Sequence, residues 1–315
     1  MAGYIVRRVL MAILITIGVA AITFVLLYIL EPSPVHDVLG RGARPAQVAA
    51  WNRANGYDRP PVVQFLSYLG NLAQLNFGYS YKLGQSVWQL FKEYAGRSIY
   101  LSGSALILSL VIAMPIGIAQ AVKRNSVGDY AMTTATFVLY AMPPFLLGLI
   151  LIDIFAFKLG IFPPLVPSTQ TSTFQAIIHP RDYVLPIATL TLINIASFSR
   201  YMRSSALDNL AQDYIRLARA KGLSNRAVLY RHLLRNACLP MITLVGLSIP
   251  DLIAGNLLVE VLFNIQGLGL LFWNALSRGD YPVLLAYTVL GGILTVLGNL
   301  AADVAITVAD PRVRL

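Results

Sequence analysis

The sequence predicts an all-α integral membrane protein with six transmembrane helices. Apolar residues fill 57% of the 315 positions, charged residues only 12%, and the mean hydropathy is +0.67. Soluble domains carry about a quarter charged residues. The apolar residues gather in runs near the roughly 20 residues that a helix needs to cross a hydrocarbon core of about 30 Å. Since lipid offers the backbone no hydrogen-bond partner, long runs without alternation indicate helices, not barrel strands.

Six apolar runs are the candidate spans. They cover residues 9–30, 99–122, 130–157, 184–199, 238–262 and 282–308. The first run follows Arg7 and Arg8, as the core of a secretory signal would, but it is too long, and Glu31-Pro32-Ser33-Pro34 follows it without a small-residue cleavage site. We therefore expect residues 1–30 to form an N-terminal cytoplasmic end and an uncleaved first transmembrane helix.

The basic residues predict the orientation of these spans. With the N-terminus inside, the cytoplasmic segments carry fourteen lysines and arginines, whereas the two short outer loops carry three. Short loops rich in Lys and Arg stay in the cytoplasm. We therefore expect a multi-pass protein in the lipid bilayer with both termini cytoplasmic. Because this distribution accounts for the net charge of +10, we expect no nucleic acid as a partner.

Residues 31–97 predict a small extracytoplasmic helical domain between the first and second spans. Pro45 opens a helical pattern that Gly56 closes, residues 62–72 carry an apolar stripe, and Ser86 can cap a third pattern. Because a stripe on one helix face has to be buried, we expect the second and third patterns to pack against the membrane helices.

Residues 98–315 predict a five-helix core with one long basic loop, at about 200–236. The loop contains eight of the fourteen cytoplasmic cations. Residues 200–221 are expected to be helical, Gly222 is suited to end that helix, and Ser224 or Asn225 can cap a second helix toward Pro240. Orientation alone explains most of these arginines. Two helices joined by a tight turn on the membrane face nevertheless indicate a mechanical element.

Prolines and polar residues inside the spans predict a possible translocation path. Pro250 lacks the N–H that would bond to the Gly246 carbonyl, so we expect a kink in the fifth span. Polar groups at membrane depth need a partner or water. The candidate residues are Pro143, Pro144, Asp251, Asn256 and Glu260.

Two further acids in the spans have structural explanations. Asp153 lies close enough to Lys158 and the membrane surface to reach both, and Asp303 shares a helix face with Asn299. Small residues also recur at spacings of three and four along the last span, which predicts a close helix contact. They are Gly291, Thr295, Gly298, Ala302 and Ala305.

The sequence lacks the patterns of an enzyme or a metal site. Cys238 is the single cysteine, which excludes an intrachain disulfide, and the three histidines are scattered. No metalloprotease or hydrolase motif occurs, and none of the five lysines follows a glycine as a phosphate-binding loop requires. We expect no catalytic, cofactor-binding or metal-binding residue in this chain. If ATP drives the protein, a partner must bind the ATP.

Seven groups of residues occur in order along the chain. They are Tyr4-Ile5-Val6-Arg7-Arg8; Asp58-Arg59-Pro60 with Gln64-Phe65 and Phe77-Gly78-Tyr79-Ser80; Ala218-Arg219-Ala220-Lys221-Gly222-Leu223; Arg231-His232 with Leu234-Arg235-Asn236; Gly267-Leu268-Gly269; Asp280-Tyr281-Pro282; and Asp310-Pro311-Arg312. Together they resemble the transmembrane permease subunit of ABC importers, in the branch that carries dipeptides, oligopeptides or nickel. In the general importer signature Glu-Ala-Ala stands where this chain has Arg216-Leu217-Ala218, so only Ala218 and Gly222 agree.

The resemblance implies a type I ABC importer permease fold in a bacterial plasma (inner) membrane. It implies a non-catalytic subunit resembling the B subunit of peptide permeases, which works by alternating access. The implied partners are a second homologous permease subunit, two ABC ATPase subunits that bind ATP and Mg, an extracytoplasmic substrate-binding protein and a peptide substrate. The implied ATPase-coupling residues are Asp213, Arg216, Ala218, Ala220, Lys221 and Gly222.

Other readings stay open at this stage. The same machine could carry nickel or another small solute such as glutathione. A stand-alone secondary transporter or channel would work without ATPase partners and often shows inverted repeats, which this sequence does not display. A membrane-embedded enzyme would need a group of reactive side chains, and none is visible.

Overall fold

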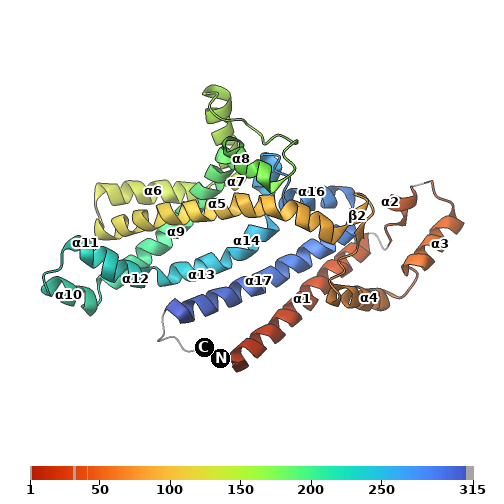
Figure 1. The fold of residues 1–315 in the computed structure, drawn as a ribbon, viewed down its shortest axis with the longest axis horizontal. Coiled ribbons are helices and arrows are strands. Elements are labelled where there is room, and N and C mark those ends of the chain that lie inside the picture. The colour runs from red at the N-terminus through yellow and green to blue at the C-terminus, as the bar shows by residue number, and fades with distance from the viewer. Residues whose placement is uncertain (1, 31–32, 41, 310–315) are drawn as a thin grey trace.

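The computed structural model describes residues 2–30, 33–40 and 42–309 and is almost entirely helical (Figure 1). Five of its spans are long and apolar enough to cross a membrane, and a bent helix pair makes six if the pair counts as one span. The five are α1 (Ala2–Leu30), α5 (Val87–Val122), α9 (Pro180–Leu210), the series α13 (Leu239–Leu247), α14 (Ile249–Ala254) and α15 (Leu257–Leu262), and α17 (Tyr281–Ala309). The predicted all-α membrane fold is confirmed.

The two ends of the bundle carry different segments of the chain (Figure 1). One end, here called the basic face, carries α10 (Asp213–Ala220), α11 (Asn225–Ala227), a π-helical segment (Val228–Leu233) and α12 (Leu234–Ala237). The opposite end, here called the insertion face, carries α2 (Val35–Leu39), α3 (Pro45–Asn55) and α4 (Pro61–Ala73). Two shorter helices, α8 (Thr173–Ile178) and α16 (Leu268–Arg278), lie between the spans.

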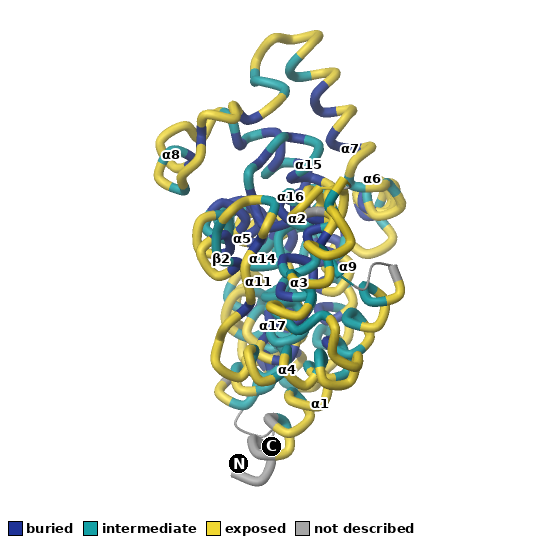
Figure 2. Tube along the Cα trace, turned by 90° about the vertical axis from the view of Figure 1, so that its right-hand side faces the viewer, coloured by how far each residue is buried: buried dark blue, intermediate teal, exposed yellow. Residues whose placement is uncertain are grey.

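The helices α5 and α9 pack closely at the centre of the bundle. A Cβ at Gly117 of α5 would lie 2.7 Å from the carbonyl oxygen of Ser199 and 2.6 Å from the Cβ of Met202, both in α9. Only glycine permits this approach of the two backbones. Figure 2 shows that buried positions gather in the middle of the bundle, whereas α4 and the segment around α8 are mostly exposed.

The segment between α1 and α5, here called the insertion, has helices α3 and α4 at the first two predicted patterns, and the third pattern begins α5. Pro45 begins α3, and Gly56 ends it in a left-handed conformation with φ of 76°. Ser86 caps a helix as predicted, since its Oγ accepts a hydrogen bond from the Gln89 N–H at 3.3 Å. That helix is α5, which runs on for 36 residues, so the third helical pattern is the beginning of the second membrane span. A polar side chain such as Arg97 does not interrupt a helical backbone, so α5 continues through it into the apolar run.

A short antiparallel hairpin joins α4 to α5. Its strands are β1 (Tyr79–Ser80) and β2 (Gln85–Ser86), with Tyr79 opposite Ser86. The hydroxyl of Ser80 donates a hydrogen bond to the carboxylate of Asp280, which precedes α17. The hairpin therefore connects the insertion to the last span.

The third predicted span is sharply bent. Helix α6 (Val127–Ala141) meets α7 (Pro144–Leu151) and its π-helical continuation (Ile152–Lys158) at an angle of 108°. Pro143 and Pro144 explain the break, because neither has an N–H and their rings exclude a continuous helix. The Leu139 carbonyl instead accepts a hydrogen bond from the Met142 N–H at 3.3 Å. Helix α7 consequently projects from the bundle (Figure 1).

The fifth and last spans meet at a contact between small residues. A Cβ at Gly298 of α17 would lie 2.7 Å from the Gly246 carbonyl oxygen, and a Cβ at Gly246 would lie 2.3 Å from that of Ala302. The predicted small-residue contact is thus confirmed at Gly298 and Ala302, whereas Gly291 faces open space. The fifth span is interrupted at Ser248, two residues before Pro250, and again at Gly255, where φ is 80°.

The basic loop differs from its prediction in one respect. Residues 200–221 are not one helix, because α9 ends at Leu210 and α10 begins at Asp213 after an extended Gln212 with ψ of 150°. This break turns α10 so that Ile215 is buried. The predicted second helix is capped by Ser224, whose Oγ accepts a hydrogen bond from the Ala227 N–H at 3.3 Å.

Candidate coupling and translocation site

Helix α10 presents one apolar and one charged side on the basic face. Ile215 and Ala218 are buried, with 0% and 4% of their surfaces exposed. Asp213 and Arg216 form an ion pair of 3.3 Å on the opposite side, with side chains 96% and 73% exposed. A pair this exposed contributes little to stability. Both charged groups are therefore free to contact a partner.

The turn after α10 requires glycine at position 222. Lys221 caps the helix, the Gly222 N–H donates to the Arg219 carbonyl at 3.0 Å, and the Leu223 N–H donates to the Ala218 carbonyl at 3.3 Å. This is a Schellman motif, in which the residue after the cap adopts a left-handed conformation. Gly222 has φ of 76°, and a Cβ there would meet nothing within 4 Å. Glycine is therefore needed for the backbone conformation, not for space.

The buried side of α10 joins it to the rest of the basic face. Ile215 and Ala218 share one apolar cluster with Val228 and Leu233 of the π-helical segment and with Met202 of α9. Close-packed side chains transmit displacement with little compression. A force applied to α10 would therefore move the end of the fourth span.

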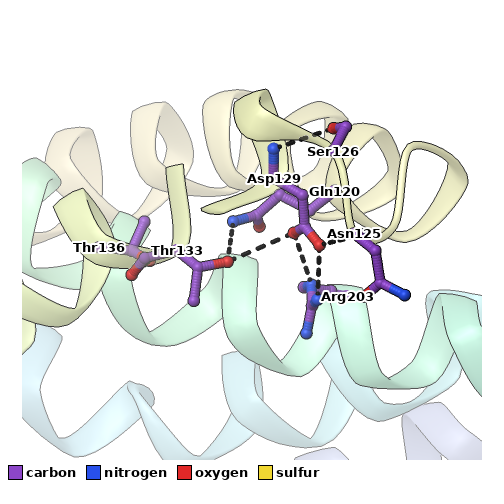
Figure 3. A network of polar contacts seen from close by, with 7 residues as sticks. All are labelled: Gln120, Asn125, Ser126, Asp129, Thr133, Thr136 and Arg203. Carbon is purple, nitrogen blue, oxygen red and sulfur yellow. Dashed lines mark hydrogen bonds and ion pairs between the residues drawn. The ribbon is translucent and has the colours of Figure 1, made fainter. Parts of the chain in front are cut away.

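A buried ion pair joins α6 to α9 (Figure 3). The guanidinium of Arg203 in α9 binds both carboxylate oxygens of Asp129 in α6, at 3.1 and 2.8 Å. The Asp129 side chain is only 2% exposed. Bidentate pairs between arginine and a carboxylate are among the strongest hydrogen-bonded contacts in proteins. The third and fourth spans are therefore held together at this level.

Hydrogen bonds extend this pair to the turn between the second and third spans (Figure 3). The Asn125 N–H donates to the Asp129 carboxylate at 3.0 Å, and the Thr133 hydroxyl contacts the same carboxylate at 3.3 Å. The Gln120 amide of α5 donates to the Thr133 hydroxyl at 3.3 Å. Sequence reasoning missed this network. Its only local signal is Ser126, whose hydroxyl accepts from the Asp129 N–H at 3.2 Å as a helix cap.

The residues of the predicted path do not converge on one surface. Pro143 and Pro144 lie at the bend of the third span, and Asp251 is exposed on α14. Asn256 is half-buried at the start of α15, whereas Glu260 is fully buried. Contact between these residues and a transported molecule stays a prediction.

Glu260 binds the start of α16. Its carboxylate accepts hydrogen bonds from the Ser98 hydroxyl at 2.7 Å and from the Leu270 N–H at 3.1 Å. The Ser98 hydroxyl in turn accepts from the Leu268 N–H at 2.8 Å. A carboxylate at a helix N-terminus is favoured by the helix dipole. In this conformation Glu260 therefore joins α5, α15 and α16 and faces no open path.

Three glycines make room for this carboxylate. A Cβ at Gly267 would lie 2.4 Å from a Glu260 carboxylate oxygen, and one at Gly269 would lie 2.9 Å away. A Cβ at Gly255 would lie 2.4 Å from the other oxygen. Real Cβ atoms do not approach an oxygen this closely without displacing it. The sequence Gly267-Leu268-Gly269 thus has a packing explanation that the sequence alone does not reveal.

Two other acids in the spans have partners. Asp153 forms an ion pair of 2.7 Å with Lys158, which confirms the predicted contact. Asp303 forms an ion pair of 2.5 Å with Arg8 of α1, in addition to sharing a helix face with Asn299. The first and last spans are thereby joined near the basic face. Among the described residues, no three His, Cys, Asp or Glu side chains come together as metal ligands.

Comparison with known proteins identifies related sequences over the whole length of the chain. The family model described as "Binding-protein-dependent transport system inner membrane component" matches residues 113–315, and the model for the N-terminal part of such components matches residues 1–101. The oligopeptide transport system permease protein AppB of Bacillus subtilis is 38% identical over 314 residues, which cover 99% of each chain. The di/tripeptide transport system permease protein DppB of Pseudomonas aeruginosa is 34% identical and covers 100% of this chain and 99% of its own.

A solved structure shares the fold. The MetNI methionine ABC transporter, in an inward-facing conformation, aligns with a TM-score of 0.52 over 71% of this chain and 97% of that chain. The two sequences are 16% identical, so the likeness concerns the fold alone.

Proposed function

Because the chain belongs to the family of inner membrane components of binding-protein-dependent transport systems, we propose that it is a permease subunit of an ATP-driven importer of peptides. The single observation that carries this proposal is the similarity over the full chain to permeases named for oligopeptides and di/tripeptides. The same names favour peptides over nickel or glutathione as cargo. The chain itself would make no covalent change to the cargo.

The proposed assembly assigns one partner to each end of the bundle. The basic face lies in the cytoplasm with both termini, and there α10 contacts one of two ATPase subunits, which hold ATP and Mg. The insertion face receives an extracytoplasmic substrate-binding protein. A second homologous permease subunit completes the path across the bilayer. The excess of cations on the basic face supports this orientation.

The proposed mechanism is alternating access driven from the basic face. Closure of the ATPase pair displaces α10, and the buried Ile215 and Ala218 pass this displacement to α9. The Asp129–Arg203 pair couples α9 to α6, so the third and fourth spans move together. Rocking of packed helices then exposes the central path on the other side of the membrane.

Transport in reconstituted vesicles tests the cargo and the coupling together. The complete transporter, with its substrate-binding protein outside, should take up a labelled dipeptide when ATP is supplied to the ATPase side. A transporter with the sequence of residues 213–222 scrambled should insert but lose its ATPase subunits on purification. Scrambling residues 45–55 of the insertion provides the control, which should keep the ATPases. Retention of the ATPases after scrambling of 213–222 contradicts the docking assignment, and uptake of nickel without uptake of dipeptide contradicts the cargo.

A further inference from the structure

A cavity opens on the insertion face between α1, α4, the β1–β2 hairpin and α17. Its volume is about 410 Å³, within the range of roughly 300–1,000 Å³ that is usual for small-molecule sites. Six tyrosines line it, namely Tyr28, Tyr57, Tyr68, Tyr79, Tyr81 and Tyr281. Arg59 is the only charged residue among the described lining residues. Over its described lining, the cavity thus combines aromatic walls with one positive charge and no negative charge.

Helix α4 turns a polar stripe toward this cavity. Gln64, Ser67, Tyr68 and Asn71 all line it, and their spacing of three, one and three residues places them on one helix face. Phe65 points elsewhere, with its ring 5.4 Å from that of Phe24 in α1. The helix therefore packs on the membrane span by its apolar side and offers hydrogen-bonding groups to the cavity by its polar side.

The tyrosine hydroxyls of the cavity are neutral donors. Burial raises the pKa of Tyr68 to about 12, and burial together with the nearby Tyr81 raises the pKa of Tyr57 to about 12. The Tyr68 hydroxyl is buried and has no hydrogen-bond partner in the described part of the chain. Buried hydroxyls are almost always paired in folded proteins. An acceptor group from a ligand would satisfy this one.

A second, apolar hollow lies deeper along the same three helices. Its volume is about 440 Å³, and Thr16 is the only polar residue among the described residues that line it. On α1, Ile17 of this hollow lies seven residues from Phe24 of the cavity, about 10 Å at 1.5 Å per residue. On α17, Ile293 lies eight residues from Leu285, or about 12 Å.

The depth of the two hollows corresponds to the layers of a bilayer. The apolar span of α1 is Leu10–Ile29 and that of α17 is Tyr281–Val308. The cavity therefore lies at the end of both spans, where tyrosines meet lipid headgroups. The apolar hollow lies within the hydrocarbon layer.

We propose that the cavity and the apolar hollow are the two halves of one binding site for a phospholipid with an anionic, hydroxyl-bearing headgroup. The lipid phosphate pairs with Arg59, and the Asn71 amide and the Tyr68 hydroxyl bind the headgroup oxygens. The Gln64 amide takes no part, because it donates to the carbonyls of Tyr57 and Arg59. One acyl chain occupies the apolar hollow, since a separation of about 10 Å is within the reach of a single lipid molecule. This site goes beyond the proposed transport function, because neither cargo nor ATP takes part in it.

Native mass spectrometry of the purified, delipidated transporter tests the proposal. The complex is incubated with phosphatidylglycerol, phosphatidylcholine or glycerol 3-phosphate, and the molecules retained are counted. The variant Arg59→Gln removes the cation, and Ala73→Phe and Ala12→Phe each fill the hollow from a different helix. Arg53→Gln, an exposed position on α3 that does not line the cavity, is the matched control.

We expect the wild-type complex to retain phosphatidylglycerol at least about fivefold better than phosphatidylcholine, because one basic group near an anionic lipid gives a preference of about this size. Arg59→Gln should abolish this preference, both phenylalanine variants should lower retention of either lipid, and Arg53→Gln should change neither. Equal retention of the two lipids by the wild type overturns the proposal. So does retention of glycerol 3-phosphate equal to that of the lipid, which indicates a free-phosphate site. If Arg59→Gln leaves lipid retention unchanged and instead weakens the binding of the substrate-binding protein to the transporter, the cavity is a protein-docking surface.

Discussion

The ion pair between Asp129 and Arg203 predicts an asymmetric response to removal of its two members. The Asp129 side chain is 2% exposed, whereas that of Arg203 is 29% exposed. In Arg203→Met the carboxylate stays buried and keeps only the Asn125 N–H and the Thr133 hydroxyl. Breaking a buried pair in this way costs about 3–5 kcal/mol. Since the carboxylate keeps two hydrogen bonds, we expect the free energy of unfolding to fall by an amount near the lower limit, about 3 kcal/mol.

The opposite variant should be milder. In Asp129→Asn the amide oxygen can still accept one hydrogen bond from Arg203, and the guanidinium can reach water through its exposed part. Loss of a charge-assisted hydrogen bond costs about 1.5–3 kcal/mol, and we expect about 1.5 kcal/mol here. The double variant should be more stable than the sum of the single losses predicts, because it leaves no buried charge. Coupling between residues in contact is typically 0.5–3 kcal/mol.

Denaturant unfolding, monitored through Cys238, measures these differences. Cys238 is the single cysteine of the chain, and its Sγ lies 3.7 Å from the Sδ of Met114, so a thiol-reactive dye reports when this region opens. Arg216→Met is the control, because that side chain is 73% exposed and should change stability little. Equal losses in the two single variants, or strictly additive losses in the double variant, would refute the idea that the buried carboxylate dominates the cost.

Two further predictions concern glycines. Gly222→Val forces a β-branched residue into a left-handed conformation, which costs at least about 1–2 kcal/mol. We expect ATP hydrolysis to continue while peptide uptake falls. The control is Gly160→Val, which is also left-handed and in open space and should leave the coupling of uptake to hydrolysis intact. If both variants took up the same amount of peptide per ATP hydrolysed, the role of the turn would be contradicted. Gly267→Ala places a Cβ 2.4 Å from the Glu260 carboxylate and should destabilise the chain by about 1–3 kcal/mol in the same unfolding assay. Gly103→Ala meets nothing within 4 Å and should be neutral or stabilising, so a similar loss at Gly103 would show that the packing explanation is wrong.

Local features of the basic loop could be predicted from sequence. The stop at Gly222 and the cap at Ser224 depend on the conformational freedom of one residue and on one side-chain hydrogen bond, and both occur as predicted. The break at Gln212 could not be predicted in this way. It arises because α10 turns to bury Ile215 against α9 and the π-helical segment, and this depends on packing between segments.

The roles of the acidic residues show the same division. The Asp153–Lys158 contact lies within one segment and was predicted. Glu260 was predicted to lie on a translocation path because it is a carboxylate in an apolar run. Its partner Ser98 is 162 residues away, the Leu270 N–H that it also binds belongs to α16, and only the Asn256 N–H comes from its own run. No pattern in the run around Glu260 could reveal that a distant helix begins beside it.

By itself the sequence determined that this is a helical membrane protein with a turn between two helices in its basic loop, and that it resembles the importer permeases. The first two properties depend on hydropathy, on charge counted along the chain and on the backbone preferences of glycine and proline, whereas the resemblance depends on seven groups of residues in order. Only the tertiary structure decided that Asp129 holds Arg203, 74 residues away, that α6 and α7 meet at 108°, and that two hollows lie along α1, α4 and α17. The reason is physical: a buried charge or a cavity is defined by the groups around it, and in a bundle of helices those groups come from segments far apart in the chain.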